Sequence, residues 1–322
     1  EDLPKMIQGE QGERKTALFG ARKVNLIILG DSLVSGVGCL DAYSPSDEVN
    51  GPILPRFLAT ALSAALNVDV QWRAIGLVGG TVTEIRRDLM PKVREDLVSA
   101  RGVDRPSSPV LRPLTRPSLL PWSAFWSWLP GRSSISSMDP SDEVTDVTVV
   151  VIICGLNDWK TLFTEFPGSS PGSFRKELSL LVDNLRQATG PEGLIFLPAI
   201  PLALAESSDL QKMPLKFFID VVSGLWDVQK KYVGSDSCRD DRGHGPTATF
   251  GTWPMAGRAR KEYPVSDGDG ECIYIGIPEH GYVSSHYNSS FLTSQSLIGD
   301  DGVHTSSSGY KLWALHIADK IV

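Results

Sequence analysis

The chain has 322 residues, long enough to bury a sizeable core without disulfides or metals to hold it together. Its composition, 41% hydrophobic and 21% charged, is typical of a globular protein and excludes the disordered, collagen-like and disulfide-scaffold classes. A net charge of −7 argues against a protein held to nucleic acid by phosphate contacts, and no apolar run reaches the 18 residues of a transmembrane helix.

The first 22 residues are polar and predict a loose N-terminal arm ahead of a single domain over residues 23–322. The chain begins at Glu1 with no apolar signal core, which indicates that a presequence has been removed or that the chain has been trimmed. The cellular compartment therefore stays open, with an organelle or secretion indicated only if a presequence has been removed.

Hydrophobic periodicity predicts alternating strands and helices after this arm. In chain order they are strand 24–29, helix 52–66, strand 68–75, helix 81–98, strand 147–154, helix 173–188, strand 194–197, helix 210–232, strand 272–277 and helix 307–321. The strand 24–29 is a continuous apolar run, as expected for a strand buried on both faces. Thr81 and Glu84 have the spacing of a capping box. This alternation predicts an α/β fold in which right-handed crossovers cover both faces of a parallel sheet.

Two segments interrupt the alternation and are predicted to be insertions into the domain. Residues 101–145 are rich in Pro, Trp and Arg, and residues 234–270 are rich in Gly and Asp. Connections this long are often either functional or disordered.

Polar side chains follow the ends of several predicted strands, where ligands bind in an open parallel sheet. Ser32 follows the first strand, Gly79 the second, and Asn157 the strand 147–154, while Asp301 and His304 precede the last helix. These residue types suit acyl transfer. Ser32 would be the nucleophile, His304 its base, and Asp301 the carboxylate that orients the imidazole. The backbone N–H groups of Ser32 and Gly79 and the amide of Asn157 would form an oxyanion hole.

The same blocks resemble the SGNH (GDSL) hydrolase superfamily, which is named for Ser, Gly, Asn and His. The matching residues are Gly30-Asp31-Ser32-Leu33, Gly79, Gly155-Leu156-Asn157-Asp158 and Asp301-Gly302-Val303-His304, in the family's order. The resemblance implies a flavodoxin-like three-layer α/β/α fold with a central parallel sheet, and a serine esterase or lipase that needs no cofactor or metal. Thr305 departs from the proline that many members have there, and the choice of Gly79 over Gly76 or Gly80 rests on its distance from Thr81.

Residues 105–138 contain four arginines and no acid, so they carry +4 and the rest of the chain −11. The same stretch contains Trp122, Phe125, Trp126 and Trp128. Basic charge beside aromatic residues suits a membrane surface, so this stretch is either a lid or membrane-docking segment or an anchor for a protein partner. The aromatic side chains could instead simply extend the core.

The expected substrate is a small-molecule acyl ester, with a lipid favoured, and no nucleic acid partner is expected. Two alternatives stay open: a catalytically silent SGNH-like subunit docked through the Trp-rich insertion, and an acetyl esterase acting on sugars. No cysteine or histidine pair has zinc-finger spacing, so no metal site is predicted. Cys154 is expected to be a buried thiol and His316 a structural side chain.

Overall fold

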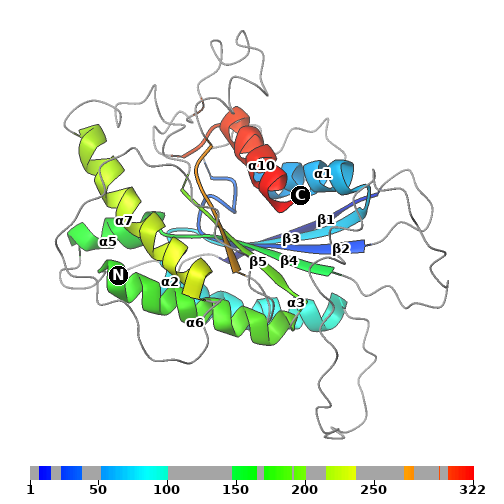
Figure 1. Cartoon of the computed structure of the whole chain (residues 1–322). Coiled ribbons are helices and arrows are strands. Elements are labelled where there is room, and N and C mark those ends of the chain that lie inside the picture. Colours follow the sequence, from blue (N-terminus) through cyan, green and yellow to red (C-terminus); the bar gives the residue numbers. More distant parts are fainter. Residues whose placement is uncertain are drawn as a thin grey trace, which may run out of the picture.

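Figure 1 shows a computed structural model of the chain, which describes residues 7–15, 23–37, 52–100, 147–164, 170–190, 192–200, 215–236, 272–278, 297 and 304–322. Within these residues six strands form one sheet in the order β1-β3-β2-β4-β5-β6. The strands are β1 (Ile7–Arg14), β2 (Lys23–Gly30), β3 (Asp69–Leu77), β4 (Val147–Ile153), β5 (Leu194–Pro198) and β6 (Cys272–Ile275). All neighbours are parallel except β1, which pairs antiparallel with β3.

The strand order identifies the fold. Leaving out the antiparallel edge strand β1, the sheet runs β3-β2-β4-β5-β6, so the second parallel strand of the chain lies outside the first. This is the 2-1-3-4-5 order of flavodoxin-like doubly wound sheets. The order reverses between β2 and β4, and ligands bind at that reversal, beyond the carboxyl ends of the strands. The fold predicted from the sequence is confirmed.

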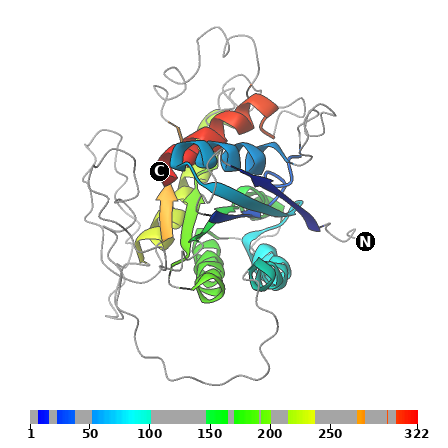
Figure 2. The same ribbon diagram turned by 90° about the vertical axis from the view of Figure 1, so that its right-hand side faces the viewer.

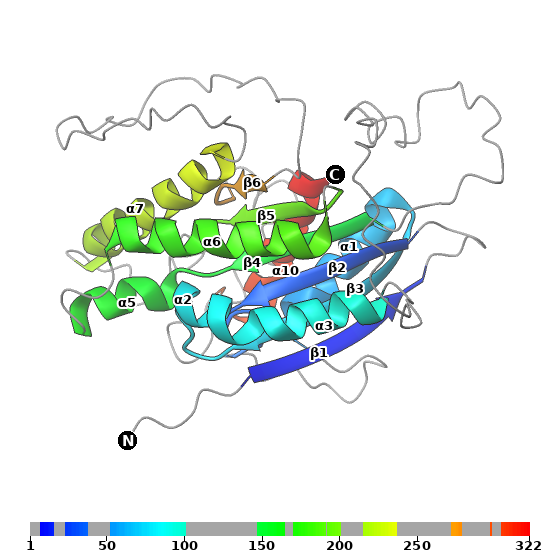
Figure 3. The ribbon, with the colours of Figure 1, turned by 90° about the horizontal axis from the view of Figure 1, so that it is seen from below.

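Helices cover both faces of the sheet and complete the three layers (Figures 2 and 3). One face is covered by α1 (Ile53–Leu66) and α10 (Ser307–Ile321), which pack on each other. The opposite face carries α2 (Val82–Glu84), the π-helical turn η2 (Ile85–Leu89), α3 (Met90–Ala100), α6 (Pro171–Thr189) and α7 (Leu215–Asp236). A further helix, α5 (Leu156–Thr164), begins directly after β4.

Each central strand divides its side chains between two apolar cores, because successive residues point to opposite faces. In β2, Leu26 and Ile28 pack in the core beneath α1 and α10, while Ile27 and Leu29 pack in the other. In β4, Val151 belongs to the first core. Burial on both faces explains why these strands read as continuous apolar runs in the sequence.

The prediction of a loose arm over residues 1–22 is wrong for Ile7–Arg14, which form β1. The segment reads Ile-Gln-Gly-Glu-Gln-Gly-Glu-Arg and lacks the alternation of apolar and polar residues that marks a half-buried strand. It pairs along its whole length with β3, from Ile7 opposite Leu77 to Arg14 opposite Val70. An edge strand needs only backbone hydrogen bonds on one side, so a polar sequence can form it.

Most other predicted elements are confirmed, with small changes at their ends. The capping box of Thr81 and Glu84 forms, but the predicted helix 81–98 is divided by the π-helical turn. Helix α6 begins two residues earlier than predicted, after a capping box at Ser170. The predicted helix 210–232 is described from Leu215, just past Pro214, and reaches Asp236, so the first residues of the predicted insertion 234–270 are helical. The remainder of that insertion, and 101–145, lie outside the described residues.

Among the described helices, none has a stretch long and apolar enough to span a membrane.

Candidate active site

Ser32 lies in a tight turn at the carboxyl end of β2. A side chain at Gly30 would clash with the carbonyl oxygen of Ile153, so glycine allows β2 and β4 to approach closely at this point. The backbone N–H of Asp31 donates to that same carbonyl at 3.2 Å. The Asp31 carboxylate accepts from the N–H of Leu33 at 3.0 Å and closes the turn. Ser32 is therefore held beyond the ends of the two central strands.

His304 is brought to Ser32 by the turn that precedes α10. The side chain of Ser306 caps this helix by accepting from the N–H of Gly309 at 3.2 Å. The Ser306 N–H in turn donates to the carbonyl of Leu297 at 3.0 Å. The Oγ of Ser32 then lies 3.0 Å from the Nε2 of His304, joining residues 272 apart in the chain. This distance is a hydrogen bond between a hydroxyl and an imidazole.

A second contact ties α10 to the serine turn. The hydroxyl of Tyr310 donates to the carbonyl of Val37 at 3.3 Å, and the Tyr310 ring is fully buried. The elements that carry Ser32 and His304 are thus joined by side-chain contacts at two places, which fixes their relative position.

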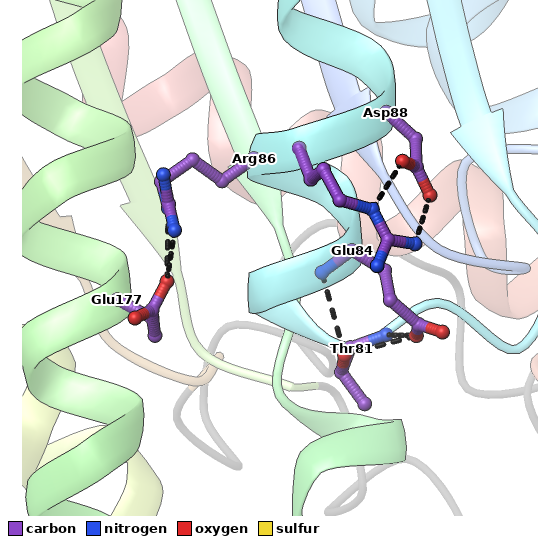
Figure 4. A network of polar contacts seen from close by, with 6 residues as sticks. Thr81, Glu84, Arg86, Asp88 and Glu177 are labelled. Atoms are coloured by element: carbon purple, nitrogen blue, oxygen red, sulfur yellow. Dashed lines mark hydrogen bonds and ion pairs between the residues drawn. The ribbon is translucent and has the colours of Figure 1, made fainter.

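The loop after β3 contains Gly79 in the left-handed region, with φ +71°. Side chains are disfavoured in that conformation, so glycine suits the turn that Gly80 closes by donating from its N–H to the carbonyl of Leu77 at 2.9 Å. The loop ends at Thr81, whose N–H donates to Glu84 at 2.8 Å (Figure 4). Figure 4 also shows Arg86 of the next turn bound to Glu177 of α6 at 2.8 Å. The loop therefore leads into a helix end that is capped and anchored to its neighbour.

Asn157 lies in the first turn of α5 and joins the serine turn to the glycine loop. Its amide nitrogen donates to the carbonyl of Gly80 at 3.2 Å and to the carboxylate of Asp31 at 3.5 Å. The second contact is at the limit of hydrogen-bonding distance and is the weaker of the two. Both place the Asn157 side chain between the loops that follow β2 and β3.

Two buried carboxyl groups lie in the same region, on Asp31 and Asp158. Burial raises the pKa of Asp31 to about 6, against the hydrogen bond from Leu33 and the charge of Lys230, which lower it. Burial likewise raises the pKa of Asp158 to about 7, against the hydrogen bond from Val82 and the charge of Lys230. Both oxygens of Asp158 lie 3.1 Å from the N–H of Val82, at the start of α2. Both carboxyl groups can therefore change protonation near neutral pH.

The structure brings together Ser32, His304, Asn157 and the loop of Gly79, which sequence reasoning selected. Asp301 and the four aromatic residues Trp122, Phe125, Trp126 and Trp128 lie outside the described residues. Asp31 and Asp158 were quoted only as letters of the motifs, and Lys230 was not selected at all. The two aspartates had a usable signal, because Asp31 directly follows the buried strand β2 and Asp158 follows the end of the buried strand β4 by five residues. Lys230 had none, since a lysine in an amphipathic helix is usually exposed.

Two other predictions about single residues, a structural His316 and a buried Cys154 thiol, are confirmed. His316 is buried within α10, and its Nε2 lies 2.8 Å from the carbonyl of Gly276, which is a structural contact. Cys154 is buried, and burial raises the pKa of its thiol to about 12, so the reactive thiolate is suppressed. Among the residues that the structure describes, no group of three His, Cys, Asp or Glu side chains is arranged to hold a metal ion.

The sequence matches no protein-family model and no curated protein. Solved structures with a similar arrangement include a protein described as a GDSL-like lipase from Parabacteroides merdae, with 13% identity, TM-score 0.46, and coverage of 96% of this chain and 100% of that one. They also include the acetylxylan esterase Axe2 from Geobacillus stearothermophilus, with 13% identity, TM-score 0.44 and 94% of each chain covered. A third is LAE5, an α/β hydrolase enzyme from the metagenome of Lake Arreo, with 13% identity, TM-score 0.44, and 93% and 95% covered. Such distant likenesses carry no conclusion about chemistry, which has to be argued from the side chains of the site.

Proposed function

We propose that the protein is a serine hydrolase that cleaves carboxylic esters through an acyl-enzyme intermediate. The observation that carries this proposal is the 3.0 Å contact between the Oγ of Ser32 and the Nε2 of His304, at the point where the strand order reverses. A serine hydroxyl is a weak nucleophile at neutral pH, and an adjacent imidazole that accepts its proton is the arrangement that activates it. The motif blocks that resemble SGNH hydrolases add support from the sequence.

In the proposed reaction, the Oγ of Ser32 attacks the ester carbonyl while His304 accepts the hydroxyl proton. His304 then gives this proton to the departing alcohol oxygen, leaving an acyl group on Ser32. Water, deprotonated by the same imidazole, attacks the acyl-enzyme, and the collapse of the second tetrahedral intermediate returns the proton to Ser32. Asp301 is proposed to orient the imidazole, because it precedes His304 by three residues in the sequence.

The negative oxygen of each tetrahedral intermediate needs hydrogen-bond donors that are already in place. We assign this role to the N–H groups of Ser32 and Gly79 and to the side-chain amide of Asn157. The Asn157 amide is held by the carbonyl of Gly80 at 3.2 Å, while its 3.5 Å contact to Asp31 is weak enough for one N–H to turn to the oxyanion. One N–H of the Asn157 amide would thus hold the side chain in place while the other binds the oxyanion, which supports Asn157 as the side-chain donor.

Asn157→Ala should lower kcat by roughly 10²–10³-fold, the loss measured when one oxyanion donor is removed. The measurement is steady-state hydrolysis of a short acyl ester at saturating substrate. Thr161→Ala is the matched control on the same helix, since within the described residues its hydroxyl donates only to the backbone carbonyl of Asp158, at 2.8 Å. Equal rates for the Asn157 variant and the control would remove Asn157 from the oxyanion hole.

The proposed function is tested by a fluorophosphonate probe, which reacts with activated serines, together with acyl esters of increasing chain length. Labelling of the wild-type protein at Ser32 and turnover of esters are the expected results. A lipid substrate predicts that kcat/KM rises with acyl length, whereas an acetyl esterase for sugars would reject long chains. The lipid class is favoured by the basic, aromatic composition of residues 105–138, which suits a membrane-docking segment or lid.

The absence of both labelling and turnover in well-folded protein would contradict the hydrolase proposal. The second candidate, a catalytically silent subunit docked through the same Trp-rich insertion, would then be favoured if the protein co-purified stably with a partner. The sequence observation behind it is the concentration of three of the eight tryptophans within residues 101–140.

A further inference from the structure

Two neighbouring residues of α5 bind the end of the loop that carries Gly79. The Asn157 amide donates to the carbonyl of Gly80 at 3.2 Å. Both carboxylate oxygens of Asp158 lie 3.1 Å from the N–H of Val82. The loop is therefore bound to α5 at two backbone groups that are two residues apart. The proposed function gives a role to the first of these contacts and none to the second.

The bond between Asp158 and Val82 is buried and satisfies the start of a helix. Both residues are almost fully buried. Val82 is the first residue of α2, and the N–H groups of a first turn have no partner inside their own helix. The side chain of Thr81 accepts from the N–H of Glu84, so the cap within the segment serves a different N–H group. The acceptor for Val82 comes instead from α5, 76 residues further along the chain.

The first turn of α5 is a fixed part of the fold. It follows β4, which lies in the middle of the sheet between β2 and β5. Gly155, with φ +113°, turns the chain from this strand into the helix. The N–H of Trp159 then donates to the carbonyl of Gly155 at 3.2 Å, and Leu156 packs in the apolar core. Asp158 is therefore carried by a rigid support beyond the carboxyl end of the sheet.

Gly79 itself is held less firmly by packing. A Cβ built at Gly79 would meet no atom within 4 Å among the described residues, so that side of the loop faces open space. Glycine also has the least restricted backbone of all residues. The direction of the Gly79 N–H is therefore fixed only if the residues that follow it are held in place. Val82, three residues further along, is where Asp158 supplies such a contact.

We propose that Asp158 is a positioning residue of the oxyanion hole: by binding the Val82 N–H it holds the Gly79 loop against the first turn of α5, so that the Gly79 N–H and the Asn157 amide keep a fixed separation. Donors that are already in place stabilise the transition state without reorganisation. A misplacement by about 1 Å can cost about 10²-fold in rate. This role rests on the proposed function, whereas the effect of Asp158 on the position of the loop does not.

The experiment removes this hydrogen bond from each of its two ends, with Asp158→Ala and Val82→Pro. Proline lacks the N–H and is tolerated at the first residue of a helix, and Thr81 before it already has the extended backbone that proline requires, with φ −80° and ψ 164°. Each variant should lower kcat by about 10–10²-fold and leave KM within about threefold, because the bond positions donors that act only in the transition state. Steady-state hydrolysis of a short acyl ester at pH 8.5 measures both constants.

Two further variants separate positioning from a general loss of stability. Asp158→Asn retains an oxygen that can accept from Val82, and Asn and Asp serve about equally well at helix starts, so its kcat should stay within about threefold of the wild type. Ser63→Ala is the matched control, since it removes a buried hydrogen bond of 2.8 Å to the carbonyl of Val68, at the other end of β3 from the Gly79 loop. It should lower Tm by a few degrees and leave kcat and KM unchanged. Equal losses of kcat in Asp158→Asn and Asp158→Ala, or in Ser63→Ala and Asp158→Ala, would overturn the proposal.

A readout that needs no turnover is the hydrogen exchange of the Gly80 amide, followed by NMR. This N–H donates to the carbonyl of Leu77 at 2.9 Å, so it reports the order of the loop without being bound to Asp158. Asp158→Ala and Val82→Pro should accelerate its exchange by about tenfold or more, and Ser63→Ala should not. Unchanged exchange in both variants, or failure of both to fold, would overturn the proposal. Absence of all turnover in the wild type would overturn the proposed function, while the exchange at Gly80 would still decide whether Asp158 holds the loop.

Discussion

Ser32→Ala should abolish ester hydrolysis, lowering kcat/KM by about 10⁴-fold or more, because the variant retains only binding and any oxyanion stabilisation. The change removes one buried oxygen and its hydrogen bond to His304, so the free energy of unfolding should fall by only about 1 kcal/mol. Initial rates with a short acyl ester and thermal unfolding of the same sample measure the two effects.

Ser35→Ala is the matched control for this variant. Ser35 lies three residues further along in the same turn, and within the described residues its buried Oγ has no hydrogen-bond partner. Its replacement should leave both turnover and fluorophosphonate labelling unchanged. Turnover at the wild-type rate in Ser32→Ala would remove Ser32 as the nucleophile and, with it, the acyl-enzyme mechanism.

His304→Ala should cause a loss of similar size, because Ser32 loses the only base that the described residues place within hydrogen-bonding distance of its Oγ. Residues that act as a unit in one step are strongly non-additive. The double variant Ser32→Ala/His304→Ala should therefore be no slower than the slower single variant. Steady-state rates of the two single variants and the double variant test this, and a further large loss in the double variant would show that the two residues act independently.

His316→Gln is the control for histidine loss in the same segment. His316 is buried in α10 and bonds to the carbonyl of Gly276 at 2.8 Å, far along the helix from the serine turn. Its replacement should cost about 1–3 kcal/mol of unfolding free energy and leave kcat/KM within a few-fold of the wild type. A variant of His316 that lost turnover while His304→Ala retained it would show that the base is wrongly assigned.

The sequence predicts the layered fold well because its strongest signals are local. The apolar run of β2, the helical spacing of α6 and the capping box at Thr81 can each be read within a few residues. The strands β2 and β4 are central and buried on both faces, so their composition alone separates them from amphipathic helices. The strand order has no local signal of this kind, and the resemblance to SGNH hydrolases, with their flavodoxin-like fold, is what implied it.

The elements that the sequence did not predict depend on contacts between distant segments. Strand β1 is polar and exists through its pairing with β3, some 60 residues away. Helix α5 was read only as a motif block, because its first turn, Leu156 to Trp159, carries the site residues. No local pattern in the sequence predicts the π-helical turn Ile85–Leu89, so the segment 81–98 was predicted as one continuous helix.

The residues of the candidate site also fall into two groups, those with a local sequence signal and those that depend on contacts between distant segments. Ser32 and His304 were selected because the chemistry of acyl transfer requires those residue types at strand and helix ends. The sequence did not single out Asp31, Asp158 and Lys230. What sets these three side chains apart is that they are charged groups buried in the fold, and a sequence pattern does not report burial. The hydrogen bond from Val82 to Asp158, across 76 residues, likewise has no local signature.

The contact between Ser32 and His304 has a consequence for biosynthesis. Its partners are 272 residues apart, and the helix that follows His304 packs against α1 near the other end of the chain. A nascent chain translated as far as β6 already contains the strands of the sheet and the nucleophile, but not the imidazole. Since closing so long a loop must await the synthesis of α10, the proposed chemistry switches on only after His304 and α10 have left the ribosome. Ester substrates met by the emerging chain are therefore left intact.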